Sequence, residues 1–381
     1  MIQGHGGDIF TIATIIGCRP EDIVDFSSNI NPLGPPAALL DFLGESLNRI
    51  TFLPDPGARP AIEAFAKHHD VPAGQVMAGN GTTQLIYALP QVLEISQALI
   101  VSPTYSDYAD ACRMHGVPYT HLFTSESCGF IPDVEEMRPA VAEADTVFIC
   151  NPNNPTGRMI PADVIDHLSR ELPQTRFVVD ESYLPFVDET QGLSLVKTQR
   201  DNVIVLHSLS KIFRIPGLRI GFLTAARKIV ERFEAFQKPW SINGLAQAAV
   251  EYLMNHGDQA DRFIEQTRQF VRQERAFFVK SLKQHTEITV IPSDTVFILA
   301  CLPEGRTASE LKSRLLRQKI LIRDCSNFNG LNECYFRISL KSRESNRRLI
   351  EELIQFFPRE NANGCKVKHL PDGRNGQPND H

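Results

Sequence analysis

The apolar run Val203-Ile-Val-Leu206 leads into Ser208-Leu-Ser-Lys211 and then into Ile215-Pro-Gly-Leu-Arg219-Ile-Gly-Phe222. A short apolar run bounded by turn residues is typical of a buried strand, so Lys211 is predicted to lie in a glycine-containing turn just after one. Partial burial and a neighbouring cation such as Arg219 would both favour the neutral amine, which can form a Schiff base with an aldehyde. The alternative is an ordinary surface lysine in a loop, and this segment alone leaves both open.

Acidic and amide side chains follow two other apolar runs. Asp180 ends the apolar run Arg176-Phe-Val-Val-Asp180, with Tyr183 three residues on. Asn154 lies in Cys150-Asn-Pro-Asn-Asn-Pro-Thr-Gly157, which follows the predicted strand Thr146–Cys150. Ligands in open α/β sheets bind at the carboxyl ends of the strands. A pyridoxal phosphate ring needs an acid beside its pyridinium nitrogen, for which Asp180 is a candidate, and donors to its phenolate oxygen, for which Tyr183 and Asn154 are candidates. The alternatives are a helix N-cap for Asp180 and an Asn-Pro turn for Asn154, but their joint occurrence favours the cofactor.

A phosphate group on the same cofactor would need an anion site. Ala78-Gly-Asn-Gly-Thr-Thr-Gln84 runs directly into a helical apolar pattern, and the backbone N–H groups at such a helix start bind anions. An ordinary capped helix start would look the same. After the run Ala98–Ser102, Tyr105 could lie flat on the pyridine ring or be a core or interface residue. The candidate phosphate ligands are Gly81, Thr82, Thr83, Ser208, Ser210 and Arg219.

Taken in chain order, these motifs resemble those of the fold type I pyridoxal-phosphate enzymes of the aspartate aminotransferase superfamily, over nearly the whole chain to about Pro358. The resemblance implies an α/β fold, in which a large domain has a mostly parallel sheet between helices and a smaller domain is α+β. It implies that Lys211 forms the imine with the cofactor, that Asp180 is the pyridinium partner and that Tyr105 is the stacked ring. It also implies Asn154 and Tyr183 as phenolate partners, and Thr82, Thr83, Ser208, Ser210 and Arg219 as the phosphate cup.

The two ends of the chain narrow the resemblance. His5-Gly-Gly7 and Asp25-Phe-Ser-Ser-Asn29-Ile-Asn-Pro-Leu-Gly-Pro-Pro36 are similar to segments of the L-threonine-O-3-phosphate decarboxylases of cobalamin biosynthesis, as is Lys238-Pro-Trp240-Ser-Ile-Asn243. The histidinol-phosphate aminotransferases share the Asn-Pro-Asn-Asn-Pro-Thr-Gly and Ser-Leu-Ser-Lys motifs but usually lack the opening His-Gly-Gly. The expected reaction is therefore decarboxylation of O-phospho-L-threonine or O-phospho-L-serine to the amino-alcohol phosphate. The alternative is a histidinol-phosphate type of transamination.

Two arginines give a second line towards the substrate. Arg323 and Arg337 lie near the ends of separate apolar runs, and a guanidinium fork suits a carboxylate or a phosphate. The resemblance implies that Arg337 holds the α-carboxylate, and that Arg323, His5 and the Asn29 region surround the substrate phosphate, with Asn154 also lining the substrate site. Either arginine could instead pair with surface acids. Because the bond held perpendicular to the cofactor ring decides the reaction, decarboxylation over transamination rests on the resemblance alone.

One position departs from the resembled family. Members commonly carry a tyrosine just before the Pro-Asp of Thr51-Phe-Leu53-Pro-Asp-Pro-Gly-Ala-Arg59, and its hydroxyl reaches the cofactor phosphate of the neighbouring subunit. This chain has Leu53 there. Either Thr51 or another group replaces that hydroxyl, or the phosphate has one donor fewer. A homodimer is still expected.

Composition limits the remaining classes. The 381 residues, 42% hydrophobic and 22% charged, are enough for a large core and two domains, and a net charge of −6 argues against nucleic-acid binding. The eight cysteines lack CxxC spacing, so reduced thiols are expected rather than a disulfide framework, and no metal site is expected. Neither a signal peptide nor a run of transmembrane length is found, which predicts a cytoplasmic protein without a membrane partner.

The chain pattern predicts the domain organisation. Strands and helices alternate from about residue 62 to 253, and a long polar helix is expected over 258–285, followed by strands at 289–291, 296–301 and 335–340 and helices at 308–318 and 344–357. We expect a large cofactor domain over 46–285 and a small domain made of 1–45 and 286–358. Residues 359–381 are predicted to be a mobile tail.

A regulator or pseudoenzyme that binds the cofactor without turnover is the alternative from a different class of protein. The presence of Lys211, Asp180 and Arg337 together speaks against it. No fused DNA-binding segment is found either. The expected partner is a phosphorylated amino acid, and the protein is expected to be an enzyme.

Overall fold

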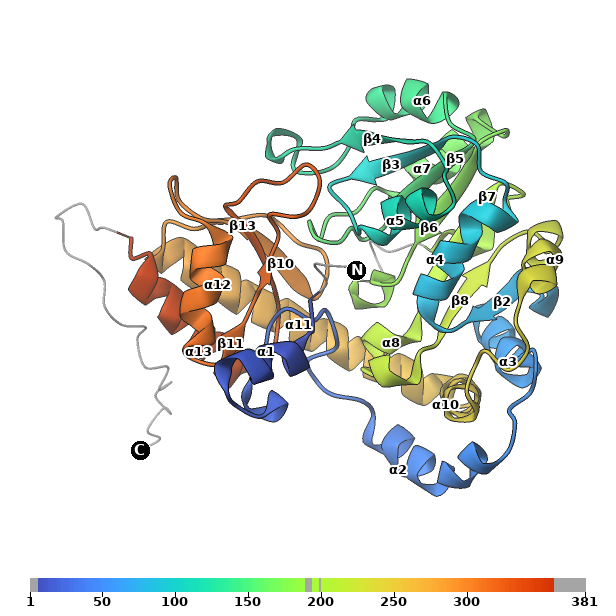
Figure 1. The fold of residues 1–381 in the computed structure, drawn as a ribbon, viewed down its shortest axis with the longest axis horizontal. Coiled ribbons are helices and arrows are strands. Elements are labelled where there is room, and N and C mark those ends of the chain that lie inside the picture. The colour runs from blue at the N-terminus through green and yellow to red at the C-terminus, as the bar shows by residue number, and fades with distance from the viewer. Residues whose placement is uncertain (1–5, 189–193, 199, 360–381) are drawn as a thin grey trace, which may run out of the picture.

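A seven-stranded sheet is the centre of the computed structural model, which describes residues 6–188, 194–198 and 200–359 (Figure 1). The strand order is β2-β8-β7-β6-β5-β3-β4. Strands β3 to β7 run parallel, whereas β8 is antiparallel to both of its neighbours. The bounds are β2 Val76–Gly79, β3 Ala98–Ser102, β4 Tyr119–Phe123, β5 Thr146–Cys150, β6 Arg176–Asp180, β7 Val203–Ser208 and β8 Gly221–Thr224.

Helices cover both faces of this sheet because its inner strands are apolar on both sides. On β5, Phe148 packs in a cluster with residues of α4 and α5, whereas its neighbours Val147 and Ile149 pack in a second cluster with residues of α6 and α7. Successive side chains of a strand point to opposite faces, so one strand serves both clusters. The helices of this region are α3 Arg59–His69, α4 Gly81–Val92, α5 Asp107–Met114, α6 Val134–Ala142, α7 Ala162–Glu171, α8 Leu209–Ile212, α9 Arg227–Phe236 and α10 Gly244–Asn255.

The C-terminal third and the N-terminal segment together form a second region with its own sheets. Its four-stranded sheet has the order β12-β13-β10-β9, and the long helix α11 packs on α13 and on α10 (Figure 1). The N-terminal strand β1 pairs in parallel with β11. The strands are β1 Val24–Asp25, β9 Thr289–Val290, β10 Phe297–Cys301, β11 Ile320–Leu321, β12 Arg323–Asp324 and β13 Tyr335–Ser339, and the helices are α1 Ile9–Ile16, α2 Ala37–Glu45, α11 Gly257–His285, α12 Ala308–Leu316 and α13 Arg343–Phe356.

The predicted elements are present, with one local difference at Lys211. The strands at 98–102, 146–150 and 176–180 have the predicted bounds, and the long helix begins one residue earlier than predicted. Lys211 lies on the one-turn helix α8 rather than in an open turn. The glycine-containing turn follows it, around the short 3₁₀ helix at 216–218.

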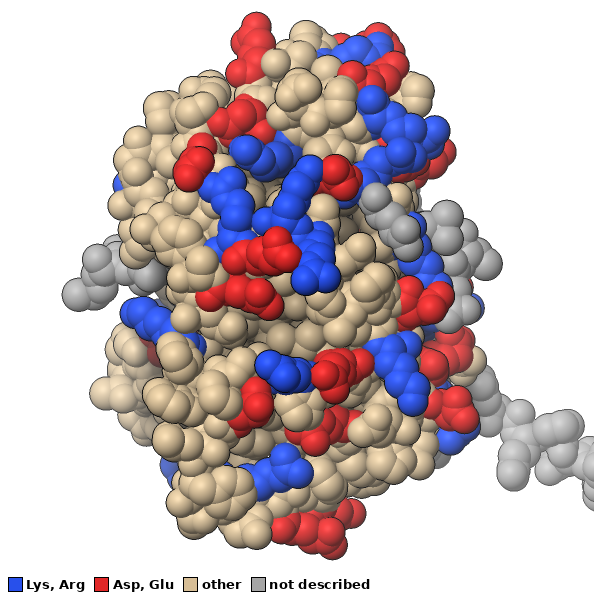
Figure 2. Space-filling view, turned by 90° about the vertical axis from the view of Figure 1, so that its right-hand side faces the viewer, with Lys and Arg blue, Asp and Glu red and all other residues tan. Residues whose placement is uncertain are grey.

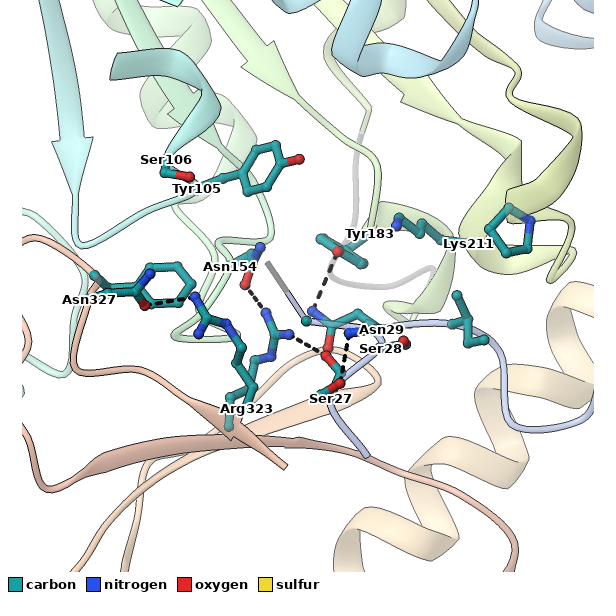
Figure 3. Close-up of a pocket in the computed structure, with 16 residues that line it drawn as sticks. Ser27, Ser28, Asn29, Tyr105, Ser106, Asn154, Tyr183, Lys211, Arg323 and Asn327 are labelled. Atoms are coloured by element: carbon teal, nitrogen blue, oxygen red, sulfur yellow. Dashed lines mark hydrogen bonds between the residues drawn. The ribbon is translucent and has the colours of Figure 1, made fainter. Parts of the chain in front are cut away.

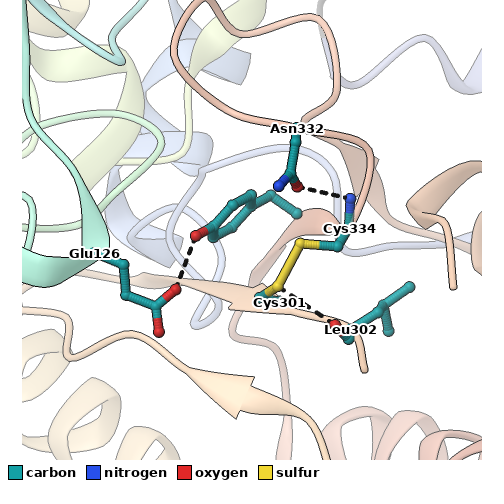
Figure 4. The surroundings of a disulfide bond; sticks show 6 residues. Glu126, Cys301, Leu302, Asn332 and Cys334 are labelled. Carbon is teal, nitrogen blue, oxygen red and sulfur yellow. Dashed lines mark hydrogen bonds between the residues drawn. A yellow bond between two sulfur atoms is a disulfide. The ribbon is translucent and has the colours of Figure 1, made fainter. Parts of the chain in front are cut away.

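The expectation of reduced thiols is wrong for one pair, because Cys301 and Cys334 form a disulfide (Figure 4). The two cysteines are 33 positions apart in the sequence, so no spacing rule predicts this contact. Strand β10 pairs antiparallel with β13 so that Cys301 lies opposite Tyr335, the residue after Cys334. That register brings the two Cα atoms to 5.2 Å. Cys18, Cys112, Cys128, Cys150 and Cys325 are free thiols.

The surface carries both signs of charge. On the face in Figure 2, basic and acidic side chains alternate rather than forming one extended basic area. None of the helices in the described ranges is both long and apolar enough to cross a membrane. Within the same ranges, no group of three or more His, Cys, Asp or Glu side chains is placed to hold a metal ion. The domain boundaries stay a prediction, and the predicted tail lies outside the described residues beyond Arg359.

Candidate active site

Strand register brings three of the predicted segments to one edge of the sheet. Cys150 at the end of β5 lies opposite Asp180 at the end of β6, and Asp180 lies opposite Leu206 of β7. All three strands are parallel, so the residues that follow them emerge at the same edge. These residues include Asn154 after β5, Tyr183 after β6 and Lys211 after β7.

The Asp180 carboxylate is buried and held by two donors. The Tyr108 hydroxyl donates to its Oδ2 at 2.9 Å, and the Ser182 backbone N–H donates to its Oδ1 at 2.9 Å. Burial raises the pKa of Asp180, and the hydrogen bonds from Ser182 and Tyr108 oppose that shift. Tyr108 is 1% exposed and lies on α5, three residues after Tyr105. An aromatic residue in a helix has the same pattern as a core residue, so the sequence alone does not reveal this contact.

The Lys211 amine is predisposed to be neutral. Burial, followed by the positive charges of Arg219 and Arg337, lowers the pKa of Lys211 to about 8, and only Asp180 acts in the opposite direction. The predicted effect of burial and of Arg219 is therefore present. Arg337 adds a second cation that the sequence could not place there.

The start of helix α4 forms a cradle without side chains. A Cβ atom on Gly81 would lie 2.5 Å from a guanidinium nitrogen of Arg219, and one on Gly221 would lie 2.5 Å from the Thr82 backbone nitrogen. Gly81 also has φ +73°, a conformation that other residues rarely adopt. The guanidinium therefore lies against the N-terminus of α4, where an anion is favoured.

A hydrogen-bonded chain connects Lys211's neighbours to the four-stranded sheet (Figure 3). The Asn29 side-chain amide donates to the Tyr183 hydroxyl at 3.4 Å, and burial raises the pKa of Tyr183 to about 12. Arg337 donates one N–H to the Asn154 side-chain oxygen and another to the Ser27 carbonyl, the latter at 2.7 Å. The guanidinium is 4% exposed, and burial lowers its pKa.

Arg323 lies directly opposite Arg337 across the antiparallel pair β12–β13. Its guanidinium donates to the Asn327 side-chain oxygen at 2.7 Å and lies 5.0 Å from the centre of the Phe328 ring. Burial lowers the pKa of Arg323 to about 10, so it stays charged at neutral pH. Like charges facing each other in a sheet are unfavourable unless an anion lies between them. Two forks on neighbouring strands therefore mark a site for an anionic ligand.

The N-terminal segment closes one wall of this site with backbone alone. The Gly7 N–H donates to the Ser27 hydroxyl at 2.8 Å. A Cβ on Gly6 would lie 2.4 Å from the Ser27 carbonyl oxygen, and one on Gly7 would lie 2.6 Å from the Ser28 hydroxyl. Close packing thus explains the Gly-Gly pair. The predicted ligand His5 lies outside the described residues.

Two connected cavities contain the predicted residues. One, of about 340 Å³, includes four predicted substrate ligands: Asn29, Asn154, Arg323 and Arg337. The other, of about 90 Å³, is lined by every predicted cofactor ligand: Gly81, Thr82, Thr83, Tyr105, Asn154, Asp180, Tyr183, Ser208, Ser210, Lys211 and Arg219. Tyr105, Asn154, Tyr183 and Lys211 line both. The structure also adds residues that sequence reasoning missed: Tyr108, Cys150 and Ser182 in the smaller cavity, and Gly6, Gly7, Ser27, Ser28, Ser106, Asn327 and Phe328 in the larger one.

Leu53 lies away from both cavities. Its side chain is 70% exposed, and the Thr51 hydroxyl donates to the Asn48 carbonyl at 2.7 Å. Neither Leu53 nor Thr51 therefore supplies the missing hydroxyl to the cofactor cavity of its own chain.

The fold and this site define a class of protein. Residues 21–353 match the family model described as aminotransferase class I and II, and the chain belongs to that family. Its members depend on pyridoxal phosphate, which confirms the predicted cofactor and the predicted fold type.

Individual relatives point to one branch of the family. The chain is 33% identical over 354 residues to the threonine-phosphate decarboxylase of Salmonella typhimurium, covering 92% of this chain and 96% of that one. It is 30% identical over 358 residues to the adenosylcobalamin biosynthesis bifunctional protein of Leptospira interrogans, of which it spans 41%. The crystal structure of L-threonine-O-3-phosphate decarboxylase from Porphyromonas gingivalis superposes with a TM-score of 0.78 at 33% identity, covering 87% of this chain and 98% of that one. Histidinol-phosphate aminotransferases also match, at 27% to 31% identity.

The residues present fit pyridoxal phosphate. Within the described part of the chain, two buried polar atoms of residues that line the larger cavity, Arg337 Nε and Asn29 Oδ1, have no hydrogen-bond partner. Buried polar atoms without partners are costly, so their presence around one site indicates a ligand. The cavity also combines an acid, a lysine amine and a glycine cradle beside an arginine, as this cofactor requires.

Replacing Gly81 tests the cradle. Gly81→Ala should weaken pyridoxal phosphate binding about tenfold or more, because the new methyl group collides with Arg219 and strains the backbone. The dissociation constant of the cofactor, measured by titration of the cofactor-free protein, checks this. Gly217→Ala is the matched control, since a Cβ there meets nothing within 4 Å. Equal cofactor affinity of both variants would contradict the cradle.

The pH dependence of reconstitution tests Lys211. Its pKa is lowered to about 8, so the neutral, nucleophilic amine becomes the major form as the pH rises through that value. The rate at which cofactor-free protein combines with pyridoxal phosphate should therefore rise with a midpoint near pH 8 rather than near the usual lysine value of about 10.4. Stopped-flow absorbance at the visible band of the bound cofactor measures the rate. A midpoint near 10 would show that Lys211 is ordinarily solvated.

Proposed function

We propose that this protein uses pyridoxal phosphate to decarboxylate O-phospho-L-threonine or O-phospho-L-serine. The observation that carries the proposal is the pairing of Arg323 with Arg337 on adjacent strands beside Lys211. A substrate with a carboxylate and a phosphate brings one anion for each fork. The names of the relatives from Salmonella typhimurium and Porphyromonas gingivalis support the same reaction.

The two arginines differ in ways that suit these two anions. Arg337 is buried, is oriented by Asn154 and by the Ser27 carbonyl, and lines the larger cavity together with Lys211. That position suits the α-carboxylate, which lies close to the reacting carbon. Arg323 is held further out by Asn327 and Phe328. It suits the more distant phosphate, with Asn29 and His5 as the further ligands that we propose.

Lys211 and Asp180 provide the chemistry at the reacting carbon. When bound, pyridoxal phosphate supplies an electron sink that stabilises negative charge on the substrate Cα. The Asp180 carboxylate would keep the ring nitrogen of that cofactor protonated, and Tyr108 and Ser182 hold the carboxylate in place. The Cα–carboxylate bond breaks, carbon dioxide leaves with the loss of that carboxyl group, and Cα gains one proton. Lys211 is the group placed to deliver it.

The remaining proposed roles follow the geometry of the smaller cavity. Asn154 and Tyr183 would contact the phenolate oxygen of the cofactor, and Tyr105 would stack on its pyridine ring. Gly81, Thr82, Thr83, Ser208, Ser210 and Arg219 hold the cofactor phosphate, because they surround the N-terminus of α4. The amino-alcohol phosphate formed would enter the nucleotide loop of cobalamin. The name of the Leptospira interrogans relative, an adenosylcobalamin biosynthesis protein, supports a role in making this cofactor.

Transamination of histidinol phosphate is the second candidate. The same cavity would hold a phosphorylated amine, and Lys211 would act as the general base at Cα. Matches to histidinol-phosphate aminotransferases at up to 31% identity favour it. That substrate lacks a carboxylate, however, so Arg337 would have no anionic group to bind on it.

A homodimer is the assembly that we propose. Four apolar side chains, Leu47, Ile50, Phe52 and Leu53, are each more than half exposed within seven residues, and Trp240 is 49% exposed. The Trp240 N–H donates to the Pro56 carbonyl at 3.0 Å, which brings Trp240 close to this segment. Clustered exposed apolar residues mark an interaction surface. The expected cytoplasmic location stays a prediction.

The substrate test compares three phosphorylated compounds. With O-phospho-L-threonine or O-phospho-L-serine, the loaded protein should release one carbon dioxide for each amino-alcohol phosphate formed, and Lys211→Ala should lose at least about a thousandfold of this rate. The gas is followed by a coupled assay and the product by mass spectrometry. Histidinol phosphate with 2-oxoglutarate is the control. If glutamate forms from histidinol phosphate and 2-oxoglutarate, and the two phosphoamino acids release no carbon dioxide, the protein is an aminotransferase and the decarboxylase proposal is wrong.

The assembly test uses the exposed apolar segment. By analytical ultracentrifugation the unmodified protein should have about twice its chain mass of 42.7 kDa. Ile50→Glu should shift it towards the monomer, because burying an unpaired carboxylate at an interface is unfavourable. Met114→Glu is the control, because it changes an exposed apolar residue outside the segment 47–53. This variant should stay dimeric. A monomeric unmodified protein would end the dimer proposal.

A further inference from the structure

The Asp25 carboxylate is the centre of a hydrogen-bond network behind the larger cavity. Its Oδ1 accepts from the Ser27 backbone N–H at 2.8 Å and from the Ser27 hydroxyl at 2.6 Å. Its Oδ2 accepts from the Ser28 hydroxyl. Ser27 and Ser28 line the cavity, whereas Asp25 lies behind them. All three donors come from one short turn, so a single carboxylate determines its shape.

The strand that carries Asp25 is itself fixed. Asp25 pairs with Leu321 of β11, and the Phe26 carbonyl accepts from the Ser339 N–H of β13 at 2.8 Å. These two strands precede Arg323 and carry Arg337, respectively. The carboxylate therefore holds the turn in a constant position relative to both arginines.

The turn formed by Ser27 and Ser28 also contacts three other segments of the chain, through Arg337, Gly7 and Lys341. The Ser27 carbonyl accepts from Arg337, and the Ser27 hydroxyl, while donating to Asp25, accepts from the Gly7 N–H. The Ser28 carbonyl accepts from the Lys341 amine at 3.4 Å. A hydroxyl that donates in one direction has its lone pairs directed elsewhere, so Asp25 sets the direction in which Ser27 can accept.

We propose that Asp25 is a positioning residue for the substrate, which aligns Arg337 through the Ser27 carbonyl and holds the Gly6–Gly7 wall through the Ser27 hydroxyl. The inference rests on the proposed function for its kinetic consequences. The geometric part stands independently of the reaction. Asp25 does not line the smaller cavity, which contains the predicted cofactor ligands. Its loss should therefore affect substrate binding more than cofactor binding.

The experiment compares Asp25→Ala, Asp25→Asn and the control Asp22→Asn. Asp25→Asn keeps an oxygen that can accept from Ser27 but replaces the acceptor for Ser28, so it should rescue part of the effect. Asp22 is a carboxylate of the same segment that pairs with the exposed Arg19. Each protein is loaded with pyridoxal phosphate. Dissociation constants for O-phospho-L-threonine are measured by calorimetry with each change combined with Lys211→Ala, which prevents turnover. The values of kcat and KM come from carbon dioxide release, and amide hydrogen exchange is followed by mass spectrometry over residues 6–9 and 25–30.

Asp25→Ala should raise KM and the substrate dissociation constant about tenfold or more, as expected for lost hydrogen bonds to a charged group. Its kcat should fall by less than KM rises, its cofactor affinity should stay unchanged, and exchange over both segments should increase. Asp25→Asn should lie between it and the unmodified protein, and Asp22→Asn should match the latter. If Asp25→Ala does not fold, Asp25→Asn decides by the same measurements.

Unchanged exchange and unchanged substrate affinity in the Asp25 variants would overturn the inference. Equal losses of cofactor and substrate affinity would do so as well, because they indicate a general structural role. If the unmodified protein releases no carbon dioxide, the proposed reaction fails. The exchange of residues 6–9 and 25–30 then still decides whether Asp25 holds the turn and the wall.

Discussion

Parallel alignment of β5, β6 and β7 is the constraint on which the site depends. Hydrogen bonding between these strands places Cys150, Asp180 and Leu206 in one row, so everything that follows them emerges at one edge. The chain is not free to separate the acid from the amine without breaking this ladder. The proximity of Asp180 to Lys211 is thus a property of the sheet. Burial, Arg219 and Arg337 lower the pKa of Lys211, and Asp180 only partly opposes them.

The four-stranded sheet holds two positively charged side chains next to each other. Pairing of β12 with β13 places Arg323 and Arg337 opposite each other, and the turn behind Asp25 orients one of them. Such a pair is unfavourable in an empty protein and favourable with a dianion bound. Under the proposed function, selectivity for a ligand with two anionic groups would therefore reside in the architecture of the sheet.

The sequence was sufficient for the cofactor side of the site, because continuous apolar runs define buried strands and their ends define where ligands gather. The predicted bounds of β3, β5 and β6 are those observed. It was insufficient where a contact depends on register between distant strands. The opposition of Arg323 and Arg337 and the Cys301–Cys334 disulfide are of this kind. Tyr108 escaped notice because its burial pattern is that of a core aromatic, and only its hydroxyl contact with Asp180 reveals the difference.

The glycine wall has a practical consequence for handling the protein. Since Gly6 and Gly7 line the larger cavity, a purification tag joined ahead of Met1 would bring foreign side chains within a few residues of the substrate. The last described helix, α13, contributes no residue to either cavity. A tag at the carboxyl terminus is therefore the better choice for measurements of ligand binding.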